Sequence, residues 1–295
     1  ALAPKKDGKN VVLGFHARKS HELVGITECP VLRPAIVAAL PALRGVASGL
    51  ISGKDEIGLL VTETATGLDL HITGLTKSAS ALARAEAASA ALRAGFARAS
   101  VEGEDVLTAR APRIPAGAAS LLPPPGGFLQ ASAEAETEMA QLVLSHLSGT
   151  KQGADLFSGC GTFAVRMAEH FPVYAAESGR AAIEALQAAL RAAPGLKPME
   201  ARVRDLFRNP VSAAELAKID GLVLDPPRAG AEAQARQIAI SGVRRVAYVS
   251  CDPATLARDL RILVDGGYHI LRIHPIDQFL WSAHVEAVAL LAKPA

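Results

Sequence analysis

The sequence lacks the features of a secreted or membrane-bound protein. Only three of its 295 residues are cysteine, too few for a disulfide framework, so we expect a reducing compartment. No run of about 18 apolar residues is present, which argues against a membrane span. The first residues, ALAPKKDGKN, contain no apolar signal-peptide core. We therefore expect a cytoplasmic protein without a membrane partner.

An excess of charge of one sign is also absent. The 31 Lys and Arg residues face 29 Asp and Glu residues, which gives a net charge of +2. Nucleic-acid-binding domains often carry a clear basic excess, so composition alone gives no support for RNA or DNA binding. Half of the residues are hydrophobic, which indicates a globular chain long enough to form two domains.

Two patterns of secondary structure follow one another along the chain. Residues 1–120 combine strand-like runs with helical stretches at 33–50 and 76–95, which predicts a small α+β domain. The prolines and glycines of LLPPPGGFLQ indicate a boundary. We expect a linker and a helix at 121–150 and a second domain at 151–295.

In the second domain, short apolar runs alternate with helical stretches. Strands are expected at 154–157, 173–177, 221–225, 245–250 and 284–292, and helices near 161–170, 179–192, 231–241 and 254–265. Alternation of this kind predicts the α/β class, with a doubly wound, mostly parallel, Rossmann-like sheet covered by helices on both faces.

Glycines and acids follow the first strands of this sheet, at the edge where open α/β folds bind ligands. Gly159 and Gly161 in DLFSGCGTF predict a turn that a ligand can approach closely. Asp155 lies late in the first strand, Glu177 ends the second where an acid can bind ribose hydroxyls, and Asp205 follows the third. The pattern predicts a nucleoside cofactor, either S-adenosylmethionine or NAD. Each acid could instead cap a helix or carry surface charge.

Two further segments contain residues suited to catalysis. LDPPRAGA at 224–231 places Asp225 at a strand end, before two prolines that hold the backbone extended. In VSCDPATLARDL at 249–260, Cys251 lies between a strand and a helix. A helix N-terminus stabilises a thiolate, so a nucleophile would be placed there. A cysteine after an apolar strand is otherwise a small buried side chain.

The segments FLQ, DLFSGCGTF, DPPRAGA, SCDPATLARDL and DQFLWSAHVE occur in this order between about 126 and 292. Together they resemble the RNA uracil-C5 methyltransferases, which make 5-methyluridine in transfer or ribosomal RNA. LGFHARKSHELVGITECPVL at 13–32 is similar to part of that family's middle domain. The resemblance implies a class I methyltransferase domain with S-adenosylmethionine as cofactor. It also implies a structured RNA partner with a flipped or single-stranded uridine, and we expect a monomer.

The resemblance assigns a role to each matching residue. Cys251 matches the nucleophile that adds to C6 of uracil, Glu286 the base that removes the C5 proton, and Asp225 an acid between cofactor and target base. Such chemistry needs a cysteine and a separate base. His284, placed on the strand face of Glu286, either tunes that carboxylate or is an ordinary core histidine. The matching cofactor positions are Gln130, Phe157, Gly159, Thr162, Glu177, Asp205 and Asp225.

The sequence departs from the family pattern at several positions. Thr162 stands where asparagine is common. Asp252 replaces the usual asparagine beside the nucleophile, and its carboxylate is expected to raise the thiol pKa unless a cation such as Arg258 offsets it. The residues LWS at 280–282 replace a Pro-x-Thr pattern before HVE.

Cys29 in ITECPVL resembles the last of four cysteines that hold a 4Fe-4S cluster in some family members. The other three would precede residue 1, and the chain contains only Cys160 and Cys251 besides. The cluster is therefore expected only in a longer chain that supplies three further cysteines, which would also carry the family's N-terminal RNA-binding barrel. Otherwise Cys29 is a small buried side chain.

Two other functions stay open. An RNA cytosine-C5 methyltransferase also uses a cysteine nucleophile, usually in a different motif, and Glu286 in HVE favours uracil. A non-catalytic RNA-binding factor on the same fold would not need both Cys251 and Glu286. An NAD-dependent oxidoreductase has no use for the DPPR and SCDPAT segments.

Overall fold

The computed structural model describes residues 1–7, 10–17, 20–51, 57–75 and 80–294. The chain forms two compact units, one of Ala1–Ile114 with Leu122–Gly126 and the other of Pro115–Leu121 with Gly127–Ala295. The sequence predicts one boundary near residue 120. In the structure, Pro115–Leu121 belongs to the second unit, whereas Leu122–Gly126 belongs to the first. No helix among the described residues is long and apolar enough to cross a membrane.

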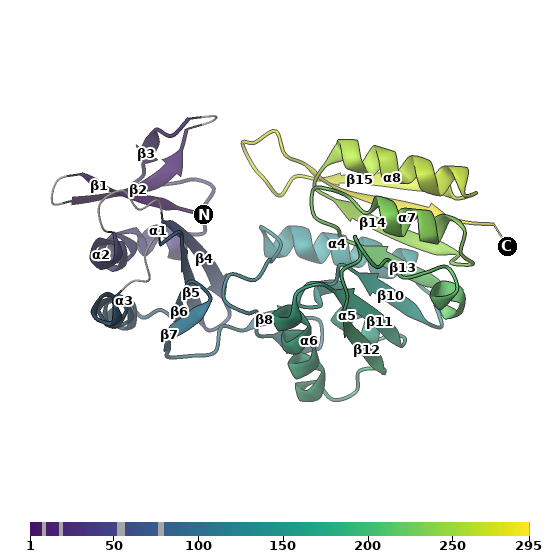
Figure 1. Cartoon of the computed structure of the whole chain (residues 1–295), viewed down its shortest axis with the longest axis horizontal. Coiled ribbons are helices and arrows are strands. Elements are labelled where there is room, and N and C mark those ends of the chain that lie inside the picture. Colours follow the sequence, from purple (N-terminus) through teal and green to yellow (C-terminus); the bar gives the residue numbers. More distant parts are fainter. Residues whose placement is uncertain (8–9, 18–19, 52–56, 76–79, 295) are drawn as a thin grey trace. The chain divides into compact units, whose positions relative to one another are not determined.

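The first unit is an α+β domain with two sheets (Figure 1). The three-stranded sheet contains β1 (Ala3–Asp7), β2 (Asn10–His16) and β3 (Leu23–Gly25). The four-stranded sheet contains β4 (Gly58–Thr64), β5 (Gly67–Thr73), β6 (Arg98–Val101) and β7 (Glu104–Thr108), in that order. The helices are α1 (Pro34–Ala38), α2 (Leu40–Leu50) and α3 (Ala81–Arg93). Apolar side chains of α2 and α3 share one core with β5, including Leu43, Ala87 and Leu70.

Two helices of this unit differ from the prediction. The helix expected at 33–50 is divided into α1 and α2, because Pro41 near the start of α2 has no N–H to continue a single helix. The helix expected from residue 76 begins at Ala81, after Ser80 accepts a hydrogen bond of 3.1 Å from the backbone N–H of Ala83. Residues 76–79 lie outside the described part.

The second unit contains a seven-stranded sheet in the order β12-β11-β10-β13-β14-β16-β15. Its strands are β10 (Gly153–Leu156), β11 (Val173–Glu177), β12 (Met199–Val203), β13 (Gly221–Leu224), β14 (Arg245–Ser250), β15 (His269–Ile276) and β16 (Glu286–Ala292). β10 to β14 are parallel, whereas β16 is antiparallel to both of its neighbours. The strand order reverses between β10 and β13, which is where open sheets of this type bind ligands.

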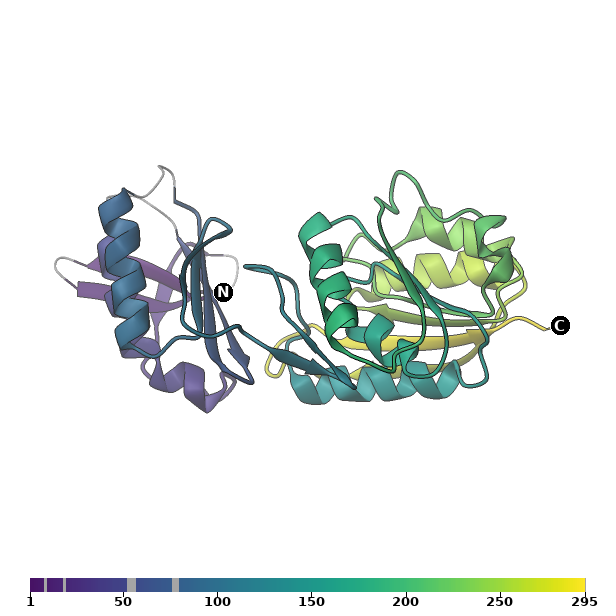
Figure 2. The same cartoon turned by 90° about the horizontal axis from the view of Figure 1, so that it is seen from below.

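Helices cover both faces of this sheet, as predicted. They are α4 (Ala133–His146), α5 (Thr162–Ala168), α6 (Arg180–Ala192), α7 (Glu232–Ala239) and α8 (Pro253–Asp265). Figure 2 shows α4 along one face and α7 and α8 along the other. The strands β8 (Ile114–Ala116) and β9 (Ala119–Leu121) form a separate two-stranded sheet. Buried side chains of β13, β14 and α8, among them Leu224, Tyr248 and Leu260, form the core.

The buried carboxylate of Asp259 joins three of these elements. Its Oδ2 atom accepts hydrogen bonds of 2.6 Å from the Tyr248 hydroxyl and 2.6 Å from the Ala231 backbone N–H. Its Oδ1 atom accepts a bond of 2.8 Å from Nε of Arg258. The side chain thereby connects α8 to β14 and to the residue before α7. The loops that precede both helices are fixed by this contact.

We expect Asp259→Ala to lower the free energy of unfolding by about 3 kcal/mol, because Tyr248 and the Ala231 N–H would lose a buried charged acceptor. Denaturant titration followed by circular dichroism measures this change. Asp265→Ala on the same helix is the matched control, since Asp265 pairs with Arg261 at the surface. Equal losses in the two variants would contradict the anchoring role of Asp259.

Candidate active site

Three predicted catalytic residues meet at one edge of the seven-stranded sheet. Asp225 directly follows β13, Cys251 directly follows β14, and Glu286 is the first residue of β16. β13 and β14 are parallel neighbours, so both end at this edge. β16 runs in the opposite direction, with Ala287 opposite Ser250, so it begins where β14 ends. The sheet topology therefore brings together side chains from three distant parts of the sequence.

A chain of side-chain amides connects two of these carboxylates. Gln130 donates from Nε2 to Oδ2 of Asp225 over 3.0 Å. Gln278 donates from Nε2 to Oε1 of Gln130 over 3.0 Å and to Oε2 of Glu286 over 2.8 Å. Gln278 was missed by sequence reasoning, although it lies in the DQFLWSAHVE segment, because one polar residue before an apolar loop carries no recognisable spacing.

Burial raises the pKa values of all three groups at this edge. The pKa of Glu286 is raised by burial, and the hydrogen bond from Gln278 opposes that rise. The pKa of Asp225 lies well above its usual range because of burial and the nearby carboxylates of Glu286 and Asp155. Burial and the Glu286 carboxylate also raise the pKa of the Cys251 thiol. The helix N-terminus beside Cys251 does not by itself give a low pKa, contrary to the expectation.

The cation beside the cysteine is Arg228 of the DPPR segment, not Arg258 as expected. The Arg228 guanidinium lowers the pKa values of both Cys251 and Asp252. Arg258 is engaged by Asp259 and lies 3.7 Å from Glu232.

Asp252 caps α8 and is not a main cause of the raised thiol pKa. Its carboxylate accepts bonds of 3.0 and 3.1 Å from the backbone N–H groups of Ala254 and Thr255, which lower its own pKa. The carboxylates that raise the pKa of Cys251 are instead Glu286 and Asp225. The expectation that Asp252 plays this role is wrong, because its charge is already turned towards the helix.

His284 does not lie on a strand, since β16 begins two residues later. The prediction for this residue was wrong, and its imidazole is exposed in the preceding loop. Nη2 of Arg228 lies 3.1 Å from Nδ1 of His284. The ring of Phe279 packs edge-on against the imidazole, with centroids 6.2 Å apart. His284 therefore helps to hold Arg228 beside the cysteine.

The predicted cofactor turn follows β10. Gly159 and Gly161 have φ angles of +52° and +98°, and Phe157 has a φ of +65°. Glu177 at the end of β11 accepts bonds of 3.2 Å from the Gly159 N–H and 2.8 Å from the Gly179 N–H. Its carboxylate thus holds the glycine turn and the start of α6 together, so it also has the structural role considered from the sequence.

Several features of this turn fit a polar nucleoside. Both carboxylate oxygens of Asp155 and the hydroxyl of Ser158 are buried without a hydrogen-bonding partner. Burial raises the pKa of Asp155 to about 7. A Cβ atom on Gly159 would meet no atom within 4 Å, so open space lies beside the backbone. Unpaired buried polar atoms are groups that a bound ligand or ordered water can satisfy.

An aromatic pair lies beyond the turn. The rings of Phe157 and Phe207 have centroids 5.4 Å apart and are tilted by 59°. Asp205 fixes this arrangement, since its Oδ1 accepts a bond of 3.0 Å from the Phe207 N–H. Thr162, the first residue of α5, is half-buried next to Gly161. Phe207 was not predicted from the sequence, because it lies in a loop without a motif.

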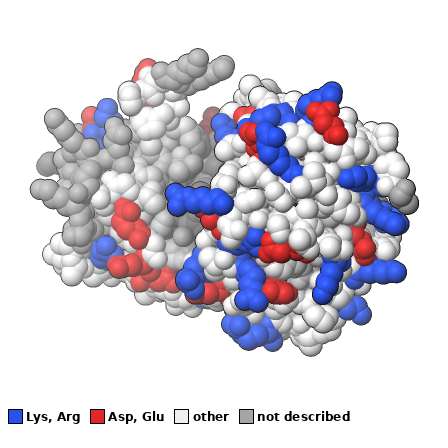
Figure 3. Space-filling model, turned by 45° about the vertical axis from the view of Figure 1, so that its right-hand side comes forward, with Lys and Arg blue, Asp and Glu red and all other residues white. Residues whose placement is uncertain are grey.

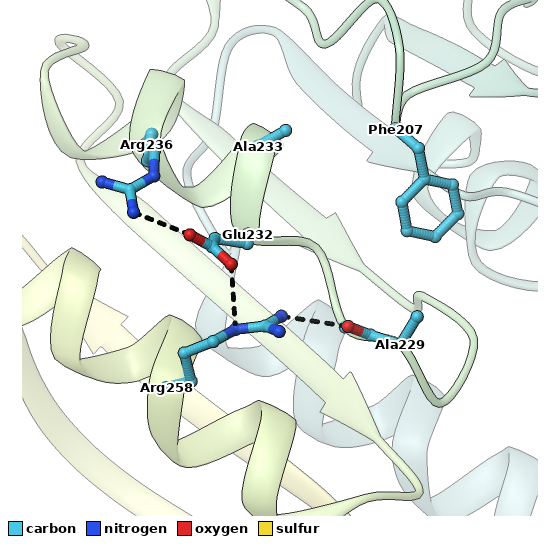
Figure 4. Close-up of a pocket in the computed structure, with 7 residues that line it drawn as sticks. Phe207, Ala229, Glu232, Ala233, Arg236 and Arg258 are labelled. Carbon is cyan, nitrogen blue, oxygen red and sulfur yellow. Dashed lines mark hydrogen bonds and ion pairs between the residues drawn. The ribbon is translucent and has the colours of Figure 1, made fainter.

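A neighbouring surface pocket of about 380 Å³ is lined by Phe207, Ala229, Gly230, Glu232, Ala233, Arg236 and Arg258 (Figure 4). Glu232 lies between two guanidinium groups, at 2.7 Å from Arg236 and 3.7 Å from Arg258. Arg258 also donates to the carbonyl of Ala229 over 3.0 Å. The charged groups of this pocket are thus already paired with one another.

The three cysteines are free thiols. Cys160 in the glycine turn is buried, which raises its pKa to about 11. Cys29 is half-exposed in the first unit. No group of three or more His, Cys, Asp or Glu side chains among the described residues is placed to hold a metal ion.

The sheet order and the glycine turn define a Rossmann-like methyltransferase fold. The family model of tRNA (uracil-5-)-methyltransferases matches residues 124–294. RNA methyltransferases of Mesorhizobium japonicum and Brucella suis are 48% and 50% identical to the chain, each over 99% of it and over 71% and 70% of the relative. The chain belongs to the tRNA (uracil-5-)-methyltransferase family.

Two more distant proteins have more specific names. A 23S rRNA (uracil(1939)-C(5))-methyltransferase of Dichelobacter nodosus is 32% identical, over 99% of the chain and 70% of that protein. The crystal structure of Pyrococcus abyssi tRNA (uracil-54, C5)-methyltransferase in complex with S-adenosyl-L-homocysteine matches with a TM-score of 0.78 and 24% identity. The match covers 99% of this chain and 74% of the other. It confirms the predicted fold of the chain.

We expect the alkylation rate of Cys251 by iodoacetamide to fall as pH decreases through a thiol pKa above the usual cysteine value. Arg228→Ala should move this midpoint up, because a nearby cation is lost, and Glu286→Gln should move it down, because an anion is lost. Each shift should be up to about one pH unit. Mass spectrometry of the labelled peptides measures the rate at each cysteine separately.

Arg236→Ala is the control, because Arg236 pairs with Glu232 and is not among the groups that shift the Cys251 pKa. A wild-type midpoint at or below that of free cysteine would contradict the electrostatic description. Shifts of the same sign in Arg228→Ala and Glu286→Gln would also contradict it.

Proposed function

We propose that the chain methylates C5 of a uridine in RNA through a covalent adduct between Cys251 and C6 of the base. The observation that carries this proposal is the meeting of Cys251, the half-buried Asp225 and the buried Glu286 at the edge where open sheets of this type bind ligands. Family membership and the names of the uracil-C5-specific relatives support it. S-adenosylmethionine supplies an electrophilic methyl group when bound, and the solved relative with S-adenosyl-L-homocysteine supports this cofactor.

The three residues divide the chemistry between them. The Cys251 thiolate adds to C6, and the electron pair of the C5–C6 double bond then makes C5 nucleophilic. After C5 has gained its methyl group, the Glu286 carboxylate removes the C5 proton. The double bond re-forms, and the C6–S bond breaks to release the thiolate. Arg228 favours the Cys251 thiolate both before its addition to C6 and after its release.

Asp225 is suited to bind the base. A carboxyl group with a raised pKa holds its proton to higher pH than usual, and in that form it can donate to a carbonyl oxygen. Gln130 holds this carboxyl in place by its 3.0 Å hydrogen bond. We assign Asp225 a position between the bound cofactor and the target base. The other proposed cofactor residues are Gln130, Phe157, Gly159, Thr162, Glu177 and Asp205.

The proposed partner is a structured RNA, transfer or ribosomal, whose target uridine leaves its stack to reach Cys251. On the face shown in Figure 3, basic and acidic side chains are interspersed, so a continuous basic surface does not drive binding there. Trp281 offers a contact for the RNA, since it is 90% exposed in the loop before Glu286 and has a φ of +64°. An exposed indole stacks on unpaired bases of any sequence.

The order of the steps gives the decisive test. Cys251→Ala should abolish both methylation and any covalent adduct, because addition to C6 comes first. Glu286→Gln should still add and methylate but should stall before elimination. With a true substrate RNA and S-adenosylmethionine, it should accumulate a methylated protein–RNA complex that survives denaturing electrophoresis.

Unmodified transcripts of ribosomal and transfer RNA identify the substrate class. The same transcripts with the target uridine replaced by cytidine are the control. Normal turnover by Glu286→Gln would disprove the role of Glu286 as the base. Methylation of the cytidine transcript would favour a cytosine methyltransferase. Binding of RNA without methylation would favour a non-catalytic factor.

The cofactor is tested by calorimetry. S-adenosyl-L-homocysteine should bind and NAD should not. Glu177→Ala should weaken binding about 10-fold or more, because a charged acceptor for the ribose hydroxyls is lost. Glu200→Ala is the control, since Glu200 is exposed on β12 and pairs with Arg202. Unchanged affinity in folded Glu177→Ala protein would contradict the assigned site.

A further inference from the structure

We propose that Gln278 is a positioning residue that keeps Glu286 competent as the base and, through Gln130, orients Asp225. This inference rests on the proposed function of the same site. It concerns a residue for which the sequence patterns give no role. Its basis is a hydrogen-bond network with a fixed direction, in which the Gln278 amide contacts Glu286 directly and Asp225 through the Gln130 amide.

The direction of the network is set by the backbone. The N–H of Ala131 donates to Oε1 of Gln278 over 3.2 Å, so the amide oxygen of Gln278 points towards Ala131. Its nitrogen must then face Gln130 and Glu286, at 3.0 and 2.8 Å. Because both N–H groups are used, rotation of the amide by 180° would break three hydrogen bonds. Gln278 is also buried, so water cannot easily replace these partners.

The amide of Gln130 takes its orientation from this arrangement. Its oxygen accepts from Gln278, so its nitrogen faces Asp225. Without Gln278, a rotated Gln130 amide would present its oxygen to Asp225 instead. The two carboxylates are therefore linked through two amides, although Asp225 follows β13 and Glu286 begins β16.

Gln278 matters most for Glu286. Glu286 is only 3% exposed, and its titratable neighbours are Asp225 after β13 and Cys251 after β14. Its partner on β15 is the apolar Ile276. Burial disfavours a charged Glu286 carboxylate, while the hydrogen bond from the Gln278 N–H favours it. A base must be deprotonated, so its function is lost as pH falls through its raised pKa.

Two substitutions separate positioning from packing. Gln278→Leu keeps most of the volume but removes the donors. Gln278→Glu keeps the shape but replaces the amide by an acid beside Glu286. We expect the acid limb of the methylation profile to move up by about one pH unit in Gln278→Leu and further in Gln278→Glu. At neutral pH, both should accumulate the methylated covalent complex, because proton removal is slowed.

A second measurement does not depend on activity. Carbon-13 NMR of labelled glutamate carboxyls gives the pKa of Glu286, whose signal is assigned by its absence from Glu286→Gln. The Glu286 pKa should rise in the order wild type, Gln278→Leu, Gln278→Glu. Gln187→Leu is the matched control, because its amide donates to the Ala201 carbonyl on β12, over 3.4 Å, and not to a carboxylate among the described residues.

The outcomes are distinct. If Gln278→Glu behaves like wild type in both measurements, Gln278 only fills space and the inference is wrong. If the Glu286 pKa moves as expected but no RNA is methylated by the wild type, the network stands and the proposed function fails. If methylation occurs but the Glu286 pKa does not move in either variant, the proposed function stands and the inference fails.

Discussion

The structure of the proposed active site depends on one buried carboxylate that is not itself at the reacting edge. Asp259 on α8 binds the Tyr248 hydroxyl on β14 and the backbone N–H of Ala231 before α7. The loops that carry Asp225 and Cys251 end at α7 and α8, so this contact fixes where both loops finish. A buried acceptor with three donors is costly to disturb.

That environment is a cluster of acids with few opposing cations. Asp155, Asp225 and Glu286 all have raised pKa values, and the thiol of Cys251 is affected in the same way. Like charges at short range cannot all be ionised in a buried site. The hydrogen bonds from Gln130 to Asp225 and from Gln278 to Glu286 each oppose the rise in pKa. Arg228 is the guanidinium that favours the thiolate, and its side chain approaches His284 of the loop before β16.

Much of the second unit could be predicted from the sequence. Buried strands such as β13 and β14 are short apolar runs, and glycines and prolines mark their ends. β15 was missed, because this edge strand is largely exposed and lacks an apolar run. The break between α1 and α2 was also missed, although Pro41 could have indicated it. The mistaken choice of Arg258 over Arg228 has a spatial cause, because chain proximity to Cys251 does not show where a guanidinium points.

The sequence by itself determined the family, the alternation of most strands and helices in the second unit, and the identities of Cys251, Asp225 and Glu286 as candidates. Local patterns suffice for these, since a strand end or a motif is a property of a few consecutive residues. Only the tertiary structure decided which side chains meet. β16 runs antiparallel to β14, which brings Glu286 beside Cys251. The same topology places Gln278 against Gln130, 148 residues earlier in the chain. Hydrogen bonds over such separations depend on the folded sheet, and no local spacing predicts them.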